Sequence, residues 1–113
     1  RSKLAGRRVQ IKGNTPTMCD ALMATMPGEM TWSVNRETVD DFLVVSEDSV
    51  AFAVAFAFRY LKLVVEPGGA VGLAALLDEK IDISGKTVGV ILSGGNIDNK
   101  TFNYCQRKYP NPE

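Results

Sequence analysis

The chain of 113 residues carries 13 Lys and Arg against 13 Asp and Glu, so its formal net charge is zero. This length suits one domain, or part of one, and no basic excess points to nucleic acid or to a membrane surface as a partner. The absence of histidine excludes Ser-His-Asp catalysis and most zinc sites. Cys19 and Cys105 match no metal spacing, so we expect no metal site and a reducing, cytoplasmic compartment.

The first quarter of the chain predicts a helix end, a strand and an apolar loop. Residues 1–6 are typical of a helix that ends at Gly6, so we expect the chain to be a fragment that begins inside an element. A short strand is predicted over residues 9–12. Asp20 is the only charge in the apolar segment 17–26, and we place it at the edge of that segment because burial of an unpaired charge is costly.

The middle of the chain predicts two helices with a strand between them. The first helix covers residues 30–37 with Trp32 on its core side, and a strand follows over residues 41–45. Large and small residues alternate in residues 50–58, as they do in a strand. The N-cap Ser46, the alanines and the lack of Gly or Pro favour a helix that is apolar nearly all round and therefore buried.

The last part of the chain contains two glycine clusters. Glu66-Pro67-Gly68-Gly69 precedes a predicted helix over residues 70–77. A β-branched run over residues 87–92 ends in Ser93-Gly94-Gly95-Asn96, which favours a buried strand, and ligands of α/β sheets collect at such strand ends. The alternative for Ser93-Gly94-Gly95-Asn96 is a tight turn that only reverses the chain. Asp98 caps a last helix to about residue 107. The alternation of strands and helices predicts an α/β fold with a largely parallel sheet.

Neither glycine cluster matches a nucleotide-binding motif. Ser84-Gly85-Lys86-Thr87 is no phosphate loop because Lys80 stands where that motif needs glycine. Gly68-Gly69 is interpreted as small residues for close packing at a helix N-terminus, with an anion-facing terminus as the alternative. Glu66 must be paired, hydrogen-bonded or turned toward a site. Three acidic pairs at element ends are interpreted as solvated caps: Asp40-Asp41, Glu47-Asp48 and Asp78-Glu79.

Residues 62–70 (KLVVEPGGA) and 90–98 (VILSGGNID) together resemble the threonine/serine dehydratases. These are pyridoxal-phosphate enzymes of fold type II, and serine racemase is a sister branch. Residues 17–22, 27–29 and 44–48 match the family in the same order, so the resemblance covers nearly the whole chain. It implies a three-layer αβα fold like the C-terminal portion of the family's large domain. Residues 1–113 would then be a single partial domain without an ACT-like regulatory domain.

The resemblance also implies roles for individual residues. Ser93 would bind the pyridine nitrogen of the cofactor, and as a neutral group it suits β-elimination. The Asp20-Ala21 loop would line the substrate side, although the family usually has glycine at Ala21, which leaves the substrate open. The expected cofactor-binding residues are Ser93, Gly94, Gly95, Asn96, Glu66 and Ala21.

Three family motifs do not occur in this sequence: the lysine in S-x-K-x-R-G, the phosphate-binding run of four glycines, and the acidic metal site. No catalytic residue is therefore assigned, and we expect pyridoxal phosphate to serve the parent enzyme but not to bind this chain alone. The parent would convert threonine or serine to a 2-oxo acid and ammonia.

Two alternatives remain open. The parent enzyme could instead be a serine racemase or a dehydratase of a related hydroxy compound. The chain itself could be a non-catalytic α/β module that forms a homo-oligomer, because apolar faces such as residues 50–58 would lack their natural cover.

Overall fold

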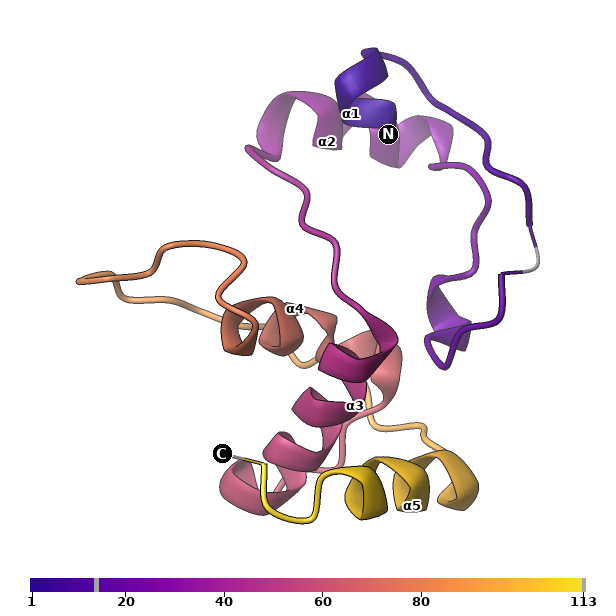
Figure 1. Ribbon diagram of the computed structural model, residues 1–113. Coiled ribbons are helices and arrows are strands. Elements are labelled where there is room, and N and C mark those ends of the chain that lie inside the picture. The colour runs from indigo at the N-terminus through magenta and orange to yellow at the C-terminus, as the bar shows by residue number, and fades with distance from the viewer. Residues whose placement is uncertain (14, 113) are drawn as a thin grey trace. The chain divides into compact units, whose positions relative to one another are not determined.

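The computed structural model describes residues 1–13 and 15–112, which form helices joined by extended segments (Figure 1). The chain divides into two compact units. The first comprises Arg1–Pro16 and Leu22–Leu43, and the second comprises Thr17–Ala21 and Val44–Glu113. No helix in the described residues is long and apolar enough to cross a membrane.

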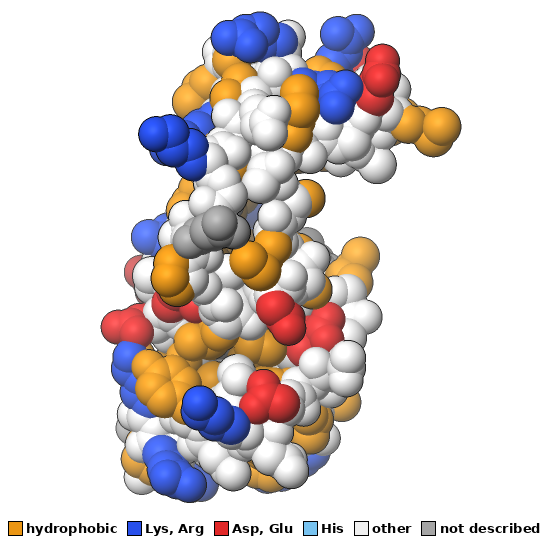
Figure 2. All heavy atoms as spheres, turned by 90° about the vertical axis from the view of Figure 1, so that its right-hand side faces the viewer, with side chains coloured by type: hydrophobic (Ala, Val, Ile, Leu, Met, Phe, Trp, Pro, Cys, Tyr) orange, Lys and Arg blue, Asp and Glu red, His pale blue; other side chains and the backbone are white. Residues whose placement is uncertain are grey.

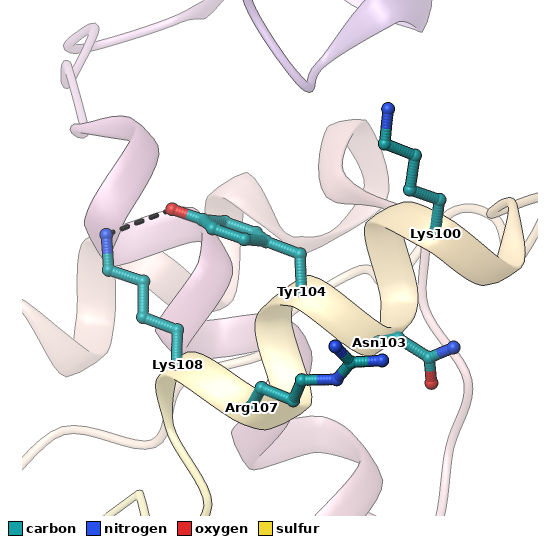
Figure 3. A pocket seen from close by; sticks show the side chains of 5 residues that line it. All are labelled: Lys100, Asn103, Tyr104, Arg107 and Lys108. Atoms are coloured by element: carbon teal, nitrogen blue, oxygen red, sulfur yellow. Dashed lines mark hydrogen bonds between the residues drawn. The ribbon is translucent and has the colours of Figure 1, made fainter.

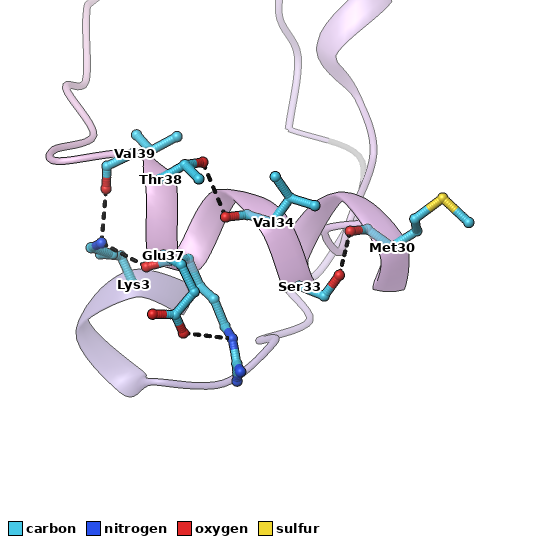
Figure 4. Close-up of polar contacts among 8 residues, drawn as sticks. Lys3, Met30, Ser33, Val34, Glu37, Thr38 and Val39 are labelled. Carbon is cyan, nitrogen blue, oxygen red and sulfur yellow. Dashed lines mark hydrogen bonds and ion pairs between the residues drawn. The ribbon is translucent and has the colours of Figure 1, made fainter.

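The first unit contains the helices α1 (Ser2–Ala5) and α2 (Glu29–Thr38). Helix α1 ends at Gly6, whose φ of 63° is the left-handed conformation predicted for a C′ glycine. Helix α2 extends the prediction by one residue at each end. The Lys3 ammonium donates to the carbonyls of Arg36 (2.9 Å) and Val39 (2.8 Å) and so ties α1 to the end of α2 (Figure 4).

None of the described side chains in the first unit is buried. Trp32, predicted on the core side of its helix, is only half-buried, because the described residues of this unit provide no core to receive it. It lines a hollow of about 220 Å³ together with Pro27, Asn35 and Phe42. Hydrophobic side chains therefore reach the surface, as Figure 2 shows, and Met30 is 83% exposed.

The second unit has a core of three packed helices. Helix α3 (Glu47–Phe56) continues into the π-helical turn η2 (Ala57–Leu61) and packs against α4 (Pro67–Leu77) and α5 (Asn99–Lys108). The short 3₁₀ helix η1 (Asp20–Leu22) overlaps the end of the segment Thr17–Ala21. The buried side chains at the centre of the unit come from α3, α4 and α5: Val50, Ala51, Ala53, Val54, Ala70, Leu73, Ala74 and Cys105.

The helical prediction for residues 50–58 is confirmed, and the expected lack of cover is wrong for its valines and alanines, while Phe58 stays 43% exposed. Val50 is 2% exposed and Val54 is 0% exposed, because α4 and α5 cover this helix. An edge-to-face aromatic pair lies at the end of α5, with 5.3 Å between the ring centroids of Phe52 and Tyr109. The apolar face expected to drive self-association is therefore already occupied within the unit.

The predicted helix caps are confirmed. The Ser46 side chain accepts from the Ser49 amide, and the Asp98 carboxylate accepts from the amides of Lys100 and Thr101. Helix α4 begins at Pro67 rather than at residue 70, because proline suits the first position of a helix.

The described residues contain no β-strand, so the strands predicted over residues 9–12, 41–45 and 87–92 are extended segments instead. A strand exists only where a neighbour completes a ladder of backbone hydrogen bonds. In residues 9–12 the Ile11 amide makes a single such bond, to the Thr25 carbonyl. The run 87–92 was expected to be buried, yet Ile91 is 85% exposed. The described part thus does not confirm the predicted sheet.

Candidate functional site

The two glycine clusters of the sequence meet in the second unit. Residues 64–66 lead into α4 and lie against the turn of residues 93–96. The Glu66 amide donates to the Gly94 carbonyl (2.9 Å), and the Glu66 carboxylate accepts from the Asn96 amide (3.1 Å). Glu66 stands at the N-cap of α4 but does not cap its own helix with its side chain. Its backbone amide and its carboxylate instead bind two different residues of the turn, Gly94 and Asn96.

This contact leaves little room for side chains on three glycines. A Cβ on Gly94 would lie 2.7 Å from Glu66 Oε1, and one on Gly95 would lie 2.6 Å from the Val64 carbonyl oxygen. A Cβ on Gly69 would lie 3.0 Å from the backbone of Gly94. The close-packing interpretation of Gly69 is therefore confirmed. Gly95 is likewise packed closely against backbone, a contact that neither the ligand interpretation nor the turn interpretation of residues 93–96 specified.

The turn carries an exposed hydroxyl group, that of Ser93. Among the described residues no hydrogen bond uses this side chain. The backbone of Ser93 lies close to α4: a Cβ atom added to Gly69 would be 3.4 Å from the Ser93 amide nitrogen. A hydroxyl can both donate and accept, so the turn presents an available polar group on a backbone that Glu66 holds.

Five of the six predicted site residues, all except Ala21, lie in the contact between Glu66 and the turn. In the described residues no hydrogen bond links Ala21 to this contact. Ala21 is exposed on η1. Asp20 is also exposed, which confirms its predicted place at an edge.

Glu47 is a residue whose contacts the sequence interpretation missed. It is exposed in the first turn of α3, as predicted for a solvated cap, and in addition its carboxylate accepts from the Thr17 hydroxyl and from the Met18 amide (2.8 Å). The Cys19 amide donates in turn to the Thr17 hydroxyl (3.0 Å). Burial raises the pKa of the Cys19 thiol, and the negative charges of Glu47 and Asp20 add to the rise.

Two other acidic caps also have partners. The Asp48 carboxylate forms an ion pair with Lys108, and the Asp78 carboxylate accepts from the Ser49 hydroxyl (2.8 Å). These contacts span about 30 to 60 residues of sequence, so no local pattern signals them.

A separate open hollow of about 480 Å³ lies along α5 and contains none of the predicted site residues. Lys108 donates to the Tyr104 hydroxyl there (3.1 Å) (Figure 3). The hydrogen bonds to Asp48 and Tyr104 raise the pKa of Lys108. The lining residues are Lys100, Asn103, Tyr104, Arg107 and Lys108. In the described residues no group of His, Cys, Asp or Glu could hold a metal ion.

Comparison with known proteins defines the class. The sequence profile of the family described as "Pyridoxal-phosphate dependent enzyme" matches residues 1–94. The chain belongs to this family, and the resemblance seen in its glycine clusters is confirmed.

Individual relatives are more specific. The L-threonine ammonia-lyase of Thermotoga maritima is 40% identical over 93 residues, which cover 82% of this chain and 23% of the relative. A serine racemase of Oryza sativa is 39% identical over 102 residues, which cover 86% of this chain and 30% of the relative. The chain thus spans less than a third of these two curated relatives.

Solved structures give the same result. A threonine deaminase of T.th. superposes with a TM-score of 0.78 at 37% identity, covering 86% of this chain and 32% of that chain. Maize serine racemase superposes with a TM-score of 0.79 at 37% identity, covering 96% and 34%. This likeness supports the predicted α/β class, to which the described residues contribute helices and extended segments.

Proposed function

We propose that the chain supplies the pyridine-nitrogen side of the cofactor site in a pyridoxal-phosphate-dependent ammonia-lyase of threonine or serine. The observation that carries the proposal is the turn of residues 93–96, which is held by Glu66 and presents the exposed Ser93 hydroxyl. The similarity to an L-threonine ammonia-lyase supports the choice of reaction.

The residues of the turn suit an aromatic nitrogen heterocycle. Pyridoxal phosphate, when bound, withdraws electrons from the α-carbon of an amino acid. The Ser93 hydroxyl would hydrogen-bond the ring nitrogen without forcing its protonation, which favours β-elimination. Gly94, Gly95 and Asn96 would form the floor beside the ring, and Glu66 would hold that floor in place.

The reaction also needs a lysine that binds the cofactor covalently and a loop that binds its phosphate, and neither motif occurs in this sequence. The overall change removes the β-hydroxyl and the amino group of the substrate and yields a 2-oxo acid and ammonia. Ala21 would lie on the substrate side. Because the lysine and phosphate-loop motifs do not occur in this sequence, no catalytic residue is assigned and we expect the chain alone not to retain the cofactor.

The extended segments would belong to a sheet in the complete enzyme. We propose that both units form one partial domain of a three-layer αβα fold with a largely parallel sheet. The support is physical: the apolar run 87–92 lacks a ladder partner in the described residues, and Val90 and Ile91 are exposed. Such surface also favours a homo-oligomer, and the free thiols of Cys19 and Cys105 suit a reducing, cytoplasmic compartment.

A second candidate parent is a serine racemase. The specific observations that favour it are the 39% identity to the Oryza sativa enzyme and the TM-score of 0.79 to the maize enzyme. Both candidates assign the same role to Ser93, so they differ only in the fate of the substrate.

The proposal is tested by titrating the ¹⁵N-labelled chain with pyridoxine phosphate, which lacks the aldehyde and so cannot react with lysines. We expect weak, reversible shifts of the Ser93 and Asn96 amide signals that disappear in Ser93→Ala. Shifts that survive this substitution, or no shifts near the turn, would contradict the proposal.

An absorption spectrum with pyridoxal phosphate, recorded before and after threonine or serine, tests the expectation for the isolated chain. We expect only free cofactor after gel filtration. A bound absorption band that responds to the amino acid would show that the chain supplies its own lysine.

A further inference from the structure

The carboxylate of Glu47 on α3 accepts the hydrogen bonds that link the segment Thr17–Ala21 to this helix. Glu47 accepts from the Thr17 hydroxyl and from the Met18 amide, and the Thr17 hydroxyl accepts from the Cys19 amide. Three consecutive residues thus depend on one side chain that lies about 30 residues away in the sequence.

Glu47 is exposed, and its position in α3 suits this contact. It is the first residue of α3, directly after the N-cap Ser46, where the helix dipole favours a negative charge. Hydrogen bonds to an ionised acceptor are stronger than those between neutral groups. Helix α3 is also the central helix of the core, so the anchor is attached to the best-packed element of the unit.

The anchored segment reaches the core through Cys19. This side chain is 8% exposed and belongs to the buried cluster around α3. Ala21 follows two residues later and is exposed. The segment is therefore buried only at its middle residue, Cys19, with the partly buried residues that contact Glu47 on one side of it and the exposed Ala21 on the other.

We propose that Glu47 is a positioning residue that fixes the segment Thr17–Ala21, and with it the substrate side of the site. The assignment of a substrate side rests on the proposed function. Glu47 itself contacts no reacting group in this proposal. It acts by holding the backbone of Met18 and the hydroxyl of Thr17, which sets where Ala21 lies.

The Cys19 thiol is a built-in reporter of this anchor. Iodoacetamide alkylation followed by mass spectrometry measures Cys19 and Cys105 separately in the same molecule. In Glu47→Ala we expect the alkylation rate of Cys19 to rise about two- to tenfold, as the loss of two exposed hydrogen bonds to a charged group implies. The rate at Cys105, which is 0% exposed in the core, should stay unchanged.

Matched variants separate the anchor from other effects. Glu47→Gln keeps one acceptor oxygen and should restore part of the protection. Thr17→Val keeps the charge of Glu47 but removes the hydroxyl, so a faster Cys19 reaction there cannot come from the loss of the Glu47 charge. Asp48→Asn removes a charge from the same helical turn without touching the segment, and should leave Cys19 protected.

Each outcome decides the proposal. Unchanged alkylation of Cys19 in both Glu47→Ala and Thr17→Val would overturn it, and so would an equal rise at Cys105, which reports general unfolding. In Glu47→Ala the pyridoxine phosphate shifts at Ser93 should persist, because the turn is held by Glu66. Missing shifts in the unsubstituted chain would instead overturn the proposed function, while the alkylation rates still decide the anchor.

Discussion

The two units of this chain show how differently helices can be stabilised. Helix α3 of the second unit buries Val50, Ala51 and Val54 between α4 and α5, whereas α2 of the first unit buries no side chain. The contacts of α2 are polar and largely local, such as the bond from the Thr38 hydroxyl to the Val34 carbonyl (Figure 4). Because exposed polar contacts contribute little net free energy, we expect most of the stability of the chain to come from the second unit.

The largest expected effect comes from removing apolar volume in each unit. Val54→Ala should lower the free energy of unfolding by about 2 kcal/mol, through lost burial and a cavity. Val34→Ala on α2 is the matched control, and since Val34 is 54% exposed we expect a change within about 0.5 kcal/mol. Urea unfolding followed by circular dichroism measures both. Equal losses would show that the first unit has a core of its own.

The next effect tests how tightly the second unit holds its turn. Gly95→Ala places a methyl group against the Val64 carbonyl and should cost about 1–3 kcal/mol, because neither backbone can yield easily. Gly89→Ala is the matched control, since a Cβ there meets nothing within 4 Å. Thermal unfolding compares the two. A harmless Gly95→Ala would mean that the close contact is not formed in solution.

Glu66 should have a smaller effect that is confined to the turn. Glu66→Ala removes the acceptor of the Asn96 amide and should cost about 1 kcal/mol. Glu66→Gln retains an acceptor oxygen and should recover most of it. Hydrogen exchange at the Asn96 amide reports this directly, and equal protection in all three proteins would rule the contact out.

In the first unit, Lys3→Met should cost only about 0.5 kcal/mol, because both of its hydrogen bonds are exposed to solvent. Amide exchange in the last turn of α2 should rise, while exchange in α3 stays the same. A loss of unfolding free energy as large as that of Val54→Ala would show that the first unit contributes as much stability as the second.

The smallest effect is a pH dependence at the cap of α5. Hydrogen bonds from Thr101 lower the pKa of Asp98 below the ordinary 3.8. A carboxylate whose pKa is lowered by folding stabilises the folded state above its unfolded pKa, and this contribution is lost as the pH falls through the folded pKa. Asp98→Asn keeps the cap without titrating, so it should flatten the acid side of the melting-temperature profile. An unchanged acid slope would contradict this.

Local signals in the sequence predicted what local contacts determine. The caps Ser46 and Asp98 and the C′ glycine Gly6 act within one helical turn, and all three are confirmed. The start of α4 at Pro67 is equally local, because proline prefers the first helical position, although the sequence analysis placed it three residues later.

Features that depend on distant residues were harder to predict. The run 87–92 has the composition of a strand, but a strand also needs a neighbour, and the sequence of one segment does not specify one. Glu47 has the pattern of an ordinary cap because its partners, Thr17 and Met18, lie far away in the chain. The meeting of Glu66 with the turn of residues 93–96 was expected only through the family resemblance, since spacing alone did not require it.

The interlocked glycines have a consequence for how variation in this chain is interpreted. In a library of variants selected for folding alone, we expect position 95 to reject side chains and position 69 to accept few, because each faces backbone atoms, whereas position 94 faces the movable carboxylate of Glu66. The intolerance at positions 69 and 95 measures the room between two backbones. An invariant glycine at position 69 or 95 in an alignment is therefore explained by packing alone, and only Ser93 would carry information on the proposed cofactor contact.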